Sequence, residues 1–100
     1  MLTSNEILAK LENNLEIVES FGVKNIGLFG SFARGEQTEL SDIDILVEFK
    51  KRQKTFDHYM ELKFFLEDLF GRKVDLVILE AVKPELKASI NRSVRYAKGA

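Results

Sequence analysis

The amino-acid sequence predicts an α/β domain in which helices pack against a small mixed β-sheet. Short apolar segments typical of buried strands alternate with longer segments whose apolar residues recur at helical spacing. The length of 100 residues is that of one domain, and neither an internal repeat nor a Gly/Ser-rich linker divides it. We therefore expect residues 1–100 to form a single domain with the order helix, strand, short helix, strand, helix, strand, helix.

In the first half of the chain, a helix begins near Thr3 and Glu6, which have capping-box spacing, and ends at Gly22. A short apolar segment follows and indicates a buried strand. The next residues predict a tight turn into a short helix, and then a polar loop. The expected elements are a helix over residues 4–21, a strand over 25–29, a short helix within 30–35 and a loop over 36–41.

In the second half, the strongest strand pattern places Ile43, Ile45, Val47 and Phe49 on one face and Asp42, Asp44, Leu46 and Glu48 on the other. The charged segment KKRQK follows and is expected to be an exposed connection. Pro84 stands where the first residue of a helix is plausible. The expected elements are a strand over residues 42–49, a helix over 55–70, a buried strand over 74–79 and a last helix from 84 to about 96.

Composition and charge limit the classes of function. There are no cysteines, which excludes disulfides and thiolate metal sites. The formal net charge is −1, so no overall field draws the chain to nucleic acid or to an anionic membrane. No apolar run approaches the roughly 18 residues that a membrane span needs, and the N-terminus lacks a basic stretch followed by an apolar one. A cytoplasmic location is therefore expected.

Asp42 and Asp44 stand two residues apart in a predicted strand, so both carboxylates leave the same face, about 6.6 Å apart along the backbone. Two anions side by side repel each other unless a cation lies between them. Carboxylate oxygens are natural ligands of Mg²⁺, which takes one or two carboxylates together with substrate phosphates. The triplet is compatible with a metal site, but taken alone it fits a polar strand end in water better.

Gly30 and Ser31 lie between an apolar strand and the expected start of a helix. Free backbone N–H groups and the helix dipole favour an anion there, and glycine lets a phosphate approach the backbone closely. The Ser31 hydroxyl can donate a further hydrogen bond, and Arg34, one turn on, can add a planar cationic fork. Taken alone, these residues also fit an ordinary helix cap with a surface arginine.

Together the two parts read G-S, ten intervening residues, then D-x-D, within GSFARGEQTELSDIDILVEF. With this motif the sequence resembles the DNA polymerase beta-like nucleotidyltransferase superfamily, and in particular its minimal nucleotidyltransferase (MNT, or MntA-like) branch. The resemblance is most specific from Gly30 to Phe49 and extends more weakly from the first helix through VDLVIL. It implies the nucleotidyltransferase fold.

The resemblance implies a role for each matching residue. Gly30 and Ser31 match the pair that holds the triphosphate of a nucleotide, and Arg34 is a further candidate for phosphate binding. Asp42 and Asp44 match the pair of carboxylates that binds Mg²⁺. We therefore expect the nucleotide at the glycine–serine turn and the metal at the D-x-D strand.

Asp75 is the candidate for a third carboxylate, which the family uses on a neighbouring strand. It is a lone acid in an apolar segment, so it must lie near a surface or find a partner, because an unpaired buried charge is costly. A strand-edge aspartate in water is the alternative. In the family reaction, two metals about 3.5–4 Å apart clamp the attacking and leaving oxygens of an in-line displacement. The implied catalytic and metal-binding set is Asp42, Asp44 and Asp75, with two Mg²⁺ ions as cofactors and ATP as substrate.

The resemblance also implies a partner. MNT domains commonly pair with HEPN-domain proteins, helical RNases that act as toxins, and the MNT protein is then the antitoxin. It is thought to neutralise the toxin by transferring AMP to a toxin tyrosine and to form a complex with it. We therefore expect a HEPN-type partner in a hetero-oligomer, no membrane association and no direct nucleic-acid binding.

Two other functions stay open on sequence alone. A binding module would keep the fold and neutralise its partner by occlusion, with slow or absent catalysis. A nucleotidyltransferase for small molecules, like the enzymes that modify aminoglycosides, would need a domain that grips the acceptor, and only about twenty residues follow the third strand. The sequence does not determine the base, the acceptor, or the choice between Mg²⁺ and Mn²⁺.

Overall fold

The computed structural model describes residues 2–97, which form a four-stranded sheet in the order β3-β2-β1-β4. β1 pairs antiparallel with both β2 and β4, whereas β2 and β3 run parallel. The predicted α/β class with a small mixed sheet is therefore confirmed. The strands are β1 (Val23–Phe29), β2 (Ile43–Phe49), β3 (Val74–Ile78) and β4 (Arg95–Tyr96).

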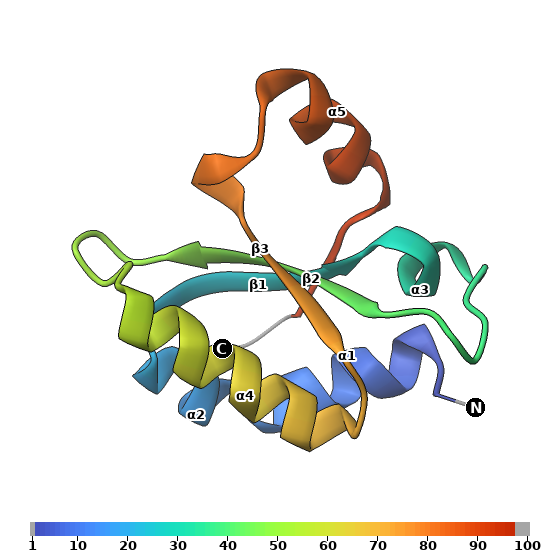
Figure 1. Cartoon of the computed structure of the whole chain (residues 1–100), viewed down its shortest axis with the longest axis horizontal. Helices are drawn as coiled ribbons and strands as arrows, with labels where there is room; N and C mark the ends of the chain where they lie inside the picture. The colour runs from blue at the N-terminus through green and yellow to red at the C-terminus, as the bar shows by residue number, and fades with distance from the viewer. Residues whose placement is uncertain (1, 98–100) are drawn as a thin grey trace.

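Helices lie on both sides of this sheet (Figure 1). Three of them lie along one face: α1 (Ser4–Asn13), α2 (Leu15–Ser20) and α4 (Phe56–Phe70). The other side carries α5 (Pro84–Ser93), while the short α3 (Gly30–Arg34) follows β1 and a 3₁₀ turn, η1 (Leu79–Ala81), follows β3. α5 contains no buried residue, and it packs against α3. Among residues 2–97, no helix is long and apolar enough to cross a membrane.

The main core lies between the sheet and the three helices on its first face. The apolar face expected for β2 is buried there, with at most 6% of any of these residues exposed: Ile43, Ile45, Val47 and Phe49. Leu46, on the opposite face of β2, is also only 1% exposed. Burying each such side chain contributes roughly 1.5–3 kcal/mol relative to leaving it in water. β2 is therefore anchored on both faces, which fixes the position of Asp44.

The single helix expected over residues 4–21 is two helices, because the chain turns at Asn14. The backbone there has φ −118° and ψ 18°, and the Asn14 side-chain amide donates a hydrogen bond to the carbonyl of Lys10 (2.8 Å). Such local side-chain bonds offer the backbone an alternative to continuing a helix. The start of the helix was predicted correctly, since the Thr3 hydroxyl caps it by accepting a hydrogen bond from the Glu6 N–H.

The last helix begins at Pro84 as expected but ends at Ser93 rather than near Tyr96. Val94 has an extended backbone, and the chain then pairs with β1 as the short strand β4. A Cβ at Gly27 of β1 would lie only 2.9 Å from Cγ2 of Val94 and 3.0 Å from Cδ1 of Tyr96. The missing side chain at Gly27 therefore leaves the room in which β4 joins the sheet.

Two strands are shorter than expected. β2 begins one residue after Asp42, and β3 ends before Leu79, which starts the 3₁₀ turn. The expectation of a buried strand is also wrong in part, because β3 is an edge strand. Val74 and Leu76 are buried as expected, but Asp75 is exposed. This exposure spares the Asp75 carboxylate the desolvation cost of full burial.

Candidate active site

Asp44 and Asp75 are partners across the sheet. In the parallel register of β2 and β3 they stand directly opposite each other, and neighbouring strands lie about 4.8 Å apart. Residues in register project from the same face of a sheet, so the two carboxylates leave it side by side. Asp42 lies just before β2 and is exposed. The register thus brings Asp44 and Asp75 together, with Asp42 at the start of the same strand.

Asp44 is the electrostatic centre of this group. Its pKa is raised from the ordinary value of 3.8 to about 6, first by burial and then by the negative charges of Asp75 and Asp42. The positive charge of Arg34 acts in the opposite direction and lowers this pKa. Two other carboxylates and one guanidinium therefore act on the Asp44 carboxylate. Together the three aspartates concentrate negative charge, and a bound cation would reduce their mutual repulsion.

Gly30 packs directly on the Asp44 carboxylate. Its backbone has a φ of +73°, a conformation that residues with a side chain rarely adopt. A Cβ at this position would overlap Oδ2 of Asp44 and lie 2.8 Å from its Cγ. The backbone conformation and the lack of space for a Cβ both require glycine here. The turn between β1 and α3 therefore packs against the acidic pair, Asp44 and Asp75.

Ser31 and Arg34 extend from this turn. Ser31 is partly buried in the first turn of α3, where backbone N–H groups lack partners within the helix, and its hydroxyl makes no hydrogen bond within residues 2–97. Arg34 is exposed, and its Nε lies 2.8 Å from Oε1 of Glu36. An exposed ion pair of this kind contributes little to stability, so Arg34 can leave it to bind an anion.

The donor set suits a hard divalent cation. Mg²⁺ prefers oxygen ligands and is usually bound by one or two carboxylates together with substrate phosphates. Within residues 2–97, no three acidic, histidine or cysteine side chains already converge as a complete metal site. The coupled charges of Asp42, Asp44 and Asp75 fit a site in which nucleotide phosphates supply the remaining ligands.

Tyr59 of α4 is a neighbour of the site that the sequence did not reveal. Its hydroxyl donates a hydrogen bond to the carbonyl of Leu76 (2.7 Å), the residue after Asp75. Its pKa is raised by burial and then by the charge of Asp75. The sequence analysis gives only a helix over residues 55–70, which contains Tyr59, and no role for this residue. A signal was present, since a hydroxyl on an inward-facing stripe needs a hydrogen-bond partner.

Comparisons with known proteins identify the family of this chain. The profile of the nucleotidyltransferase domain family matches residues 11–97. The chain is similar to the protein adenylyltransferase MntA of Thermococcus cleftensis, with 42% identity over 97 residues that cover 96% of this chain and 97% of that protein.

The fold is also similar to solved structures. One, assigned provisionally as a minimal nucleotidyltransferase, has a TM-score of 0.82 and 33% identity and covers 94% of this chain and 95% of its own. Another is a chain in the crystal structure of a toxin–antitoxin with AMP-PNP, with a TM-score of 0.69, 28% identity and coverage of 99% and 75%. The chain therefore belongs to the nucleotidyltransferase domain family, in its minimal, MntA-like branch.

Proposed function

We propose that this chain transfers AMP from ATP to a hydroxyl group of a partner protein and acts as the antitoxin of a toxin–antitoxin pair. The observation that carries the proposal is the packing of Gly30 against Asp44, which itself pairs with Asp75. In this arrangement the turn that would bind phosphate lies beside a group of carboxylates. Transfer of a nucleotidyl group needs both in contact, because the metal joins the phosphates to the protein.

Each group of residues would have its own role in the reaction. Gly30 and Ser31 would hold the β- and γ-phosphates, and Arg34 would add a cationic contact. Asp42, Asp44 and Asp75 would hold the divalent cations, which supply charge neutralisation at the phosphates and at the acceptor oxygen. Positioning and electrostatic stabilisation then account for the rate, with no covalent intermediate on the protein.

The transfer itself is a single displacement at the α-phosphorus of ATP. The acceptor oxygen forms a bond to that phosphorus while the bond to the bridging α–β oxygen breaks, and pyrophosphate leaves with the electron pair. The proton of the acceptor hydroxyl passes to a nearby base, for which Asp75 is placed on the outer strand of the pair. Its exposure leaves it accessible to an acceptor carried by another protein.

The choice of ATP and of a protein acceptor rests on the relatives. The Thermococcus cleftensis protein is named as a protein adenylyltransferase, and the toxin–antitoxin structure contains AMP-PNP, an analogue of ATP. The family resemblance adds a HEPN-type RNase as the partner and a tyrosine as the acceptor. We therefore propose a HEPN-type toxin, bound in a hetero-oligomer, as the protein that receives AMP.

Intact mass spectrometry tests this proposal. A HEPN-type protein from the same genome is incubated with this chain, ATP and Mg²⁺, and we expect its mass to increase by one or more AMP units. Asp44→Asn should abolish the increase, whereas Asp68→Asn, an exposed acid on α4, should leave it unchanged. Equal modification by the Asp44→Asn protein would refute the assigned site. A stable complex without any gain in mass would favour neutralisation by occlusion.

A further inference from the structure

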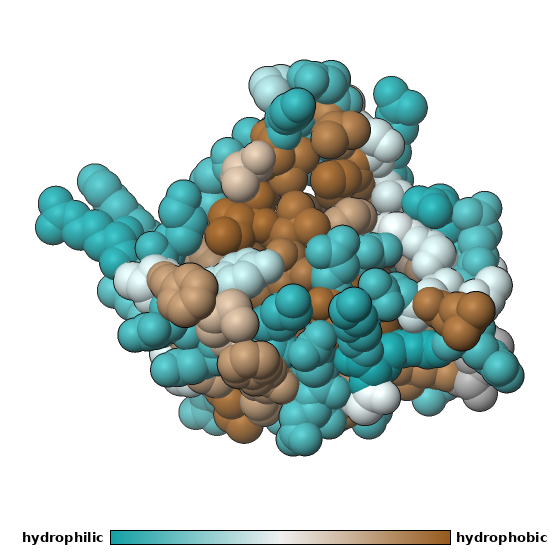
Figure 2. Space-filling model, in the orientation of Figure 1, coloured by the Kyte–Doolittle hydropathy of each residue, from teal (hydrophilic) through white to brown (hydrophobic). Residues whose placement is uncertain are grey.

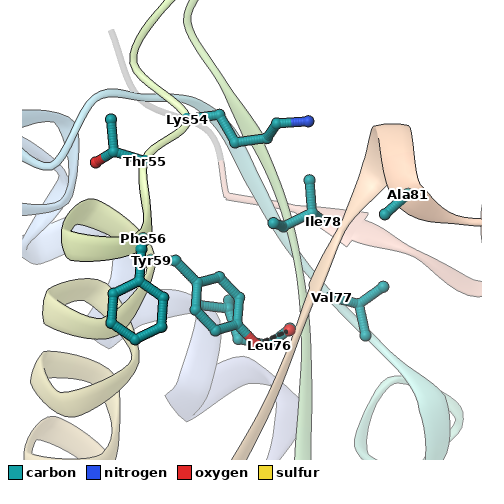
Figure 3. Close-up of a pocket in the computed structure, with 8 residues that line it drawn as sticks. All are labelled: Lys54, Thr55, Phe56, Tyr59, Leu76, Val77, Ile78 and Ala81. Carbon is teal, nitrogen blue, oxygen red and sulfur yellow. Dashed lines mark hydrogen bonds between the residues drawn. The ribbon is translucent and has the colours of Figure 1, made fainter.

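A mostly apolar pocket of about 520 Å³ lies along the outer edge of β3 (Figure 3). Phe56 and Tyr59 of α4 line one side, and β3 with η1 lines the other. Lys54 extends across one end, with its amine directed towards Ile78. Figure 2, in the orientation of Figure 1, shows apolar side chains gathered between α4 and α5, where β3 runs. We call this the β3–α4 pocket.

Side chains of α4 form hydrogen bonds with the outer edge of β3. The Tyr59 hydroxyl is bonded to the Leu76 carbonyl (2.7 Å), and the Glu67 carboxylate accepts a hydrogen bond from the Val74 N–H (3.0 Å). Both bonds use backbone groups on the outer edge of β3. An added strand would need those same groups, so the edge is suited to binding side chains rather than to strand pairing.

The order of the strands places the pocket on the acceptor side of the site. Gly30 follows β1, Asp44 lies on β2, Asp75 lies on β3, and the pocket lies beyond β3. In an in-line displacement the attacking oxygen and the leaving group lie on opposite sides of the phosphorus. With pyrophosphate held at Gly30, next to β1, the acceptor must approach from the side of β3.

We propose that the β3–α4 pocket binds a bulky apolar side chain of the acceptor protein, next to the hydroxyl that receives AMP. This inference rests on the proposed function and specifies its acceptor. Apart from Lys54 and Thr55, the lining is aromatic and aliphatic, so most of the pocket would desolvate a phosphate or a sugar without offering hydrogen bonds in return. A Phe, Leu or Tyr side chain fits this chemistry, and the pocket has ample room for it, since its volume is in the range of ordinary ligand pockets.

A titration followed by the amide chemical shifts of the ¹⁵N-labelled chain tests binding at the pocket. The probe is N-acetyl-L-phenylalaninamide, and N-acetylglycinamide is the control without a side chain. We expect saturable shifts at Val77 and Ala81 with the first compound and none with the second. Equal effects of the two compounds, or shifts centred elsewhere, would overturn the proposal.

Two exposed phenylalanines on α4 provide matched variants. Phe56 lines the pocket and is 77% exposed, whereas Phe64 does not line it and is 60% exposed. Truncating an aromatic anchor at an interface typically weakens binding about fivefold or more. We expect Phe56→Ala to raise the KM for a HEPN-type acceptor by about that factor with kcat little changed, and Phe64→Ala to have no effect. An equal KM for the two variants would contradict the inference.

Titration with a nucleotide distinguishes a pocket for an acceptor side chain from a pocket for the base of ATP. Titration with AMP-PNP and Mg²⁺ should shift amides around Gly30 and leave those of Val77 and Ala81 unchanged. Shifts of the pocket amides, together with weaker AMP-PNP binding by Phe56→Ala, would assign the pocket to the nucleobase and overturn the proposal. If AMP transfer persists with an unchanged KM in Phe56→Ala, the proposed function stands and the pocket assignment fails.

Discussion

Gly30 packs so closely on the Asp44 carboxylate that no side chain fits between them. The left-handed backbone of Gly30 and the closeness of its Cα to the Asp44 carboxylate both exclude a Cβ. One glycine therefore links the turn that we propose to bind phosphate to Asp44 and its neighbour Asp75. Its contribution can be separated into backbone strain and steric overlap, because Gly35 has almost the same φ, +71°, with nothing within 4 Å of its Cβ position.

Gly30→Ala should lose AMP transfer and destabilise the fold by about 2–4 kcal/mol, through left-handed strain and overlap with Asp44. Gly35→Ala should cost only about 1–2 kcal/mol, from strain alone, and should keep its activity. Urea denaturation gives both stabilities, and the mass assay gives the activities. Similar losses in the two variants would show that the contact with Asp44 has no role.

The acidic pair should make the stability of the metal-free protein depend on pH. The folded-state pKa of Asp44, about 6, lies above its ordinary value of 3.8, so between these values the folded chain binds more protons than the unfolded chain. Protonation of Asp44 therefore contributes to the free energy of unfolding. This contribution is complete below about pH 4 and is lost as the pH rises through 6. We expect a loss of about 1 kcal/mol after discounting for solvent screening.

Asp44→Asn isolates this effect. Without metal, the variant should be more stable than the wild type above pH 6 and should lack that part of the pH dependence, because the repulsion from Asp75 and Asp42 is gone. Urea denaturation in EDTA between pH 4 and 8 measures both curves. A variant that is less stable than the wild type at pH 7 would contradict the raised pKa.

Metal and nucleotide together should stabilise the folded chain. A ligand at a hundred times its Kd adds about 2.7 kcal/mol to the free energy of unfolding, so AMP-PNP with Mg²⁺ should raise the Tm of the wild type. Asp44→Asn should show little of this increase. Thermal denaturation with EDTA, with Mg²⁺ alone and with both ligands distinguishes the cases. An equal Tm increase in Asp44→Asn would place the metal elsewhere.

Ser31→Ala should weaken triphosphate binding more than it affects folding. A hydrogen bond to a charged group is worth about 1.5–3 kcal/mol, which corresponds to a loss of affinity of about tenfold or more. Because the hydroxyl makes no hydrogen bond within residues 2–97, its removal should change the free energy of unfolding little. Calorimetric titration with AMP-PNP and Mg²⁺ measures the affinity, with Ser89→Ala on α5 as the control. Unchanged affinity would remove Ser31 from the site.

Strong periodic patterns predicted most of the fold. The alternation in β2 identified its buried face correctly, and the capping residue Thr3 and Pro84 marked the starts of two helices. The break at Asn14 and the strand β4 were missed for different reasons. The first depends on one side-chain hydrogen bond, and the second on space above Gly27 that exists only after the sheet has formed.

The candidate site was likewise predicted only in part. The motif located Gly30, Ser31, Asp42 and Asp44 along the chain, but their mutual packing follows from the register of β1, β2 and β3. Tyr59 was missed because its partner, the Leu76 carbonyl, is a backbone group far away in sequence. The tyrosine hydroxyl indicates that a hydrogen-bond partner is needed, but the sequence does not identify a backbone carbonyl as that partner.

The absence of buried residues in α5 has an energetic consequence. A helix that contributes nothing to the core can open locally at a small fraction of the free energy of global unfolding. Its amide hydrogens should therefore exchange with solvent well before those of β1 and β2. Since α5 packs against α3, which begins at the turn that we propose to bind phosphate, such opening would widen the approach to the candidate site for a large protein substrate while the sheet beneath stays intact.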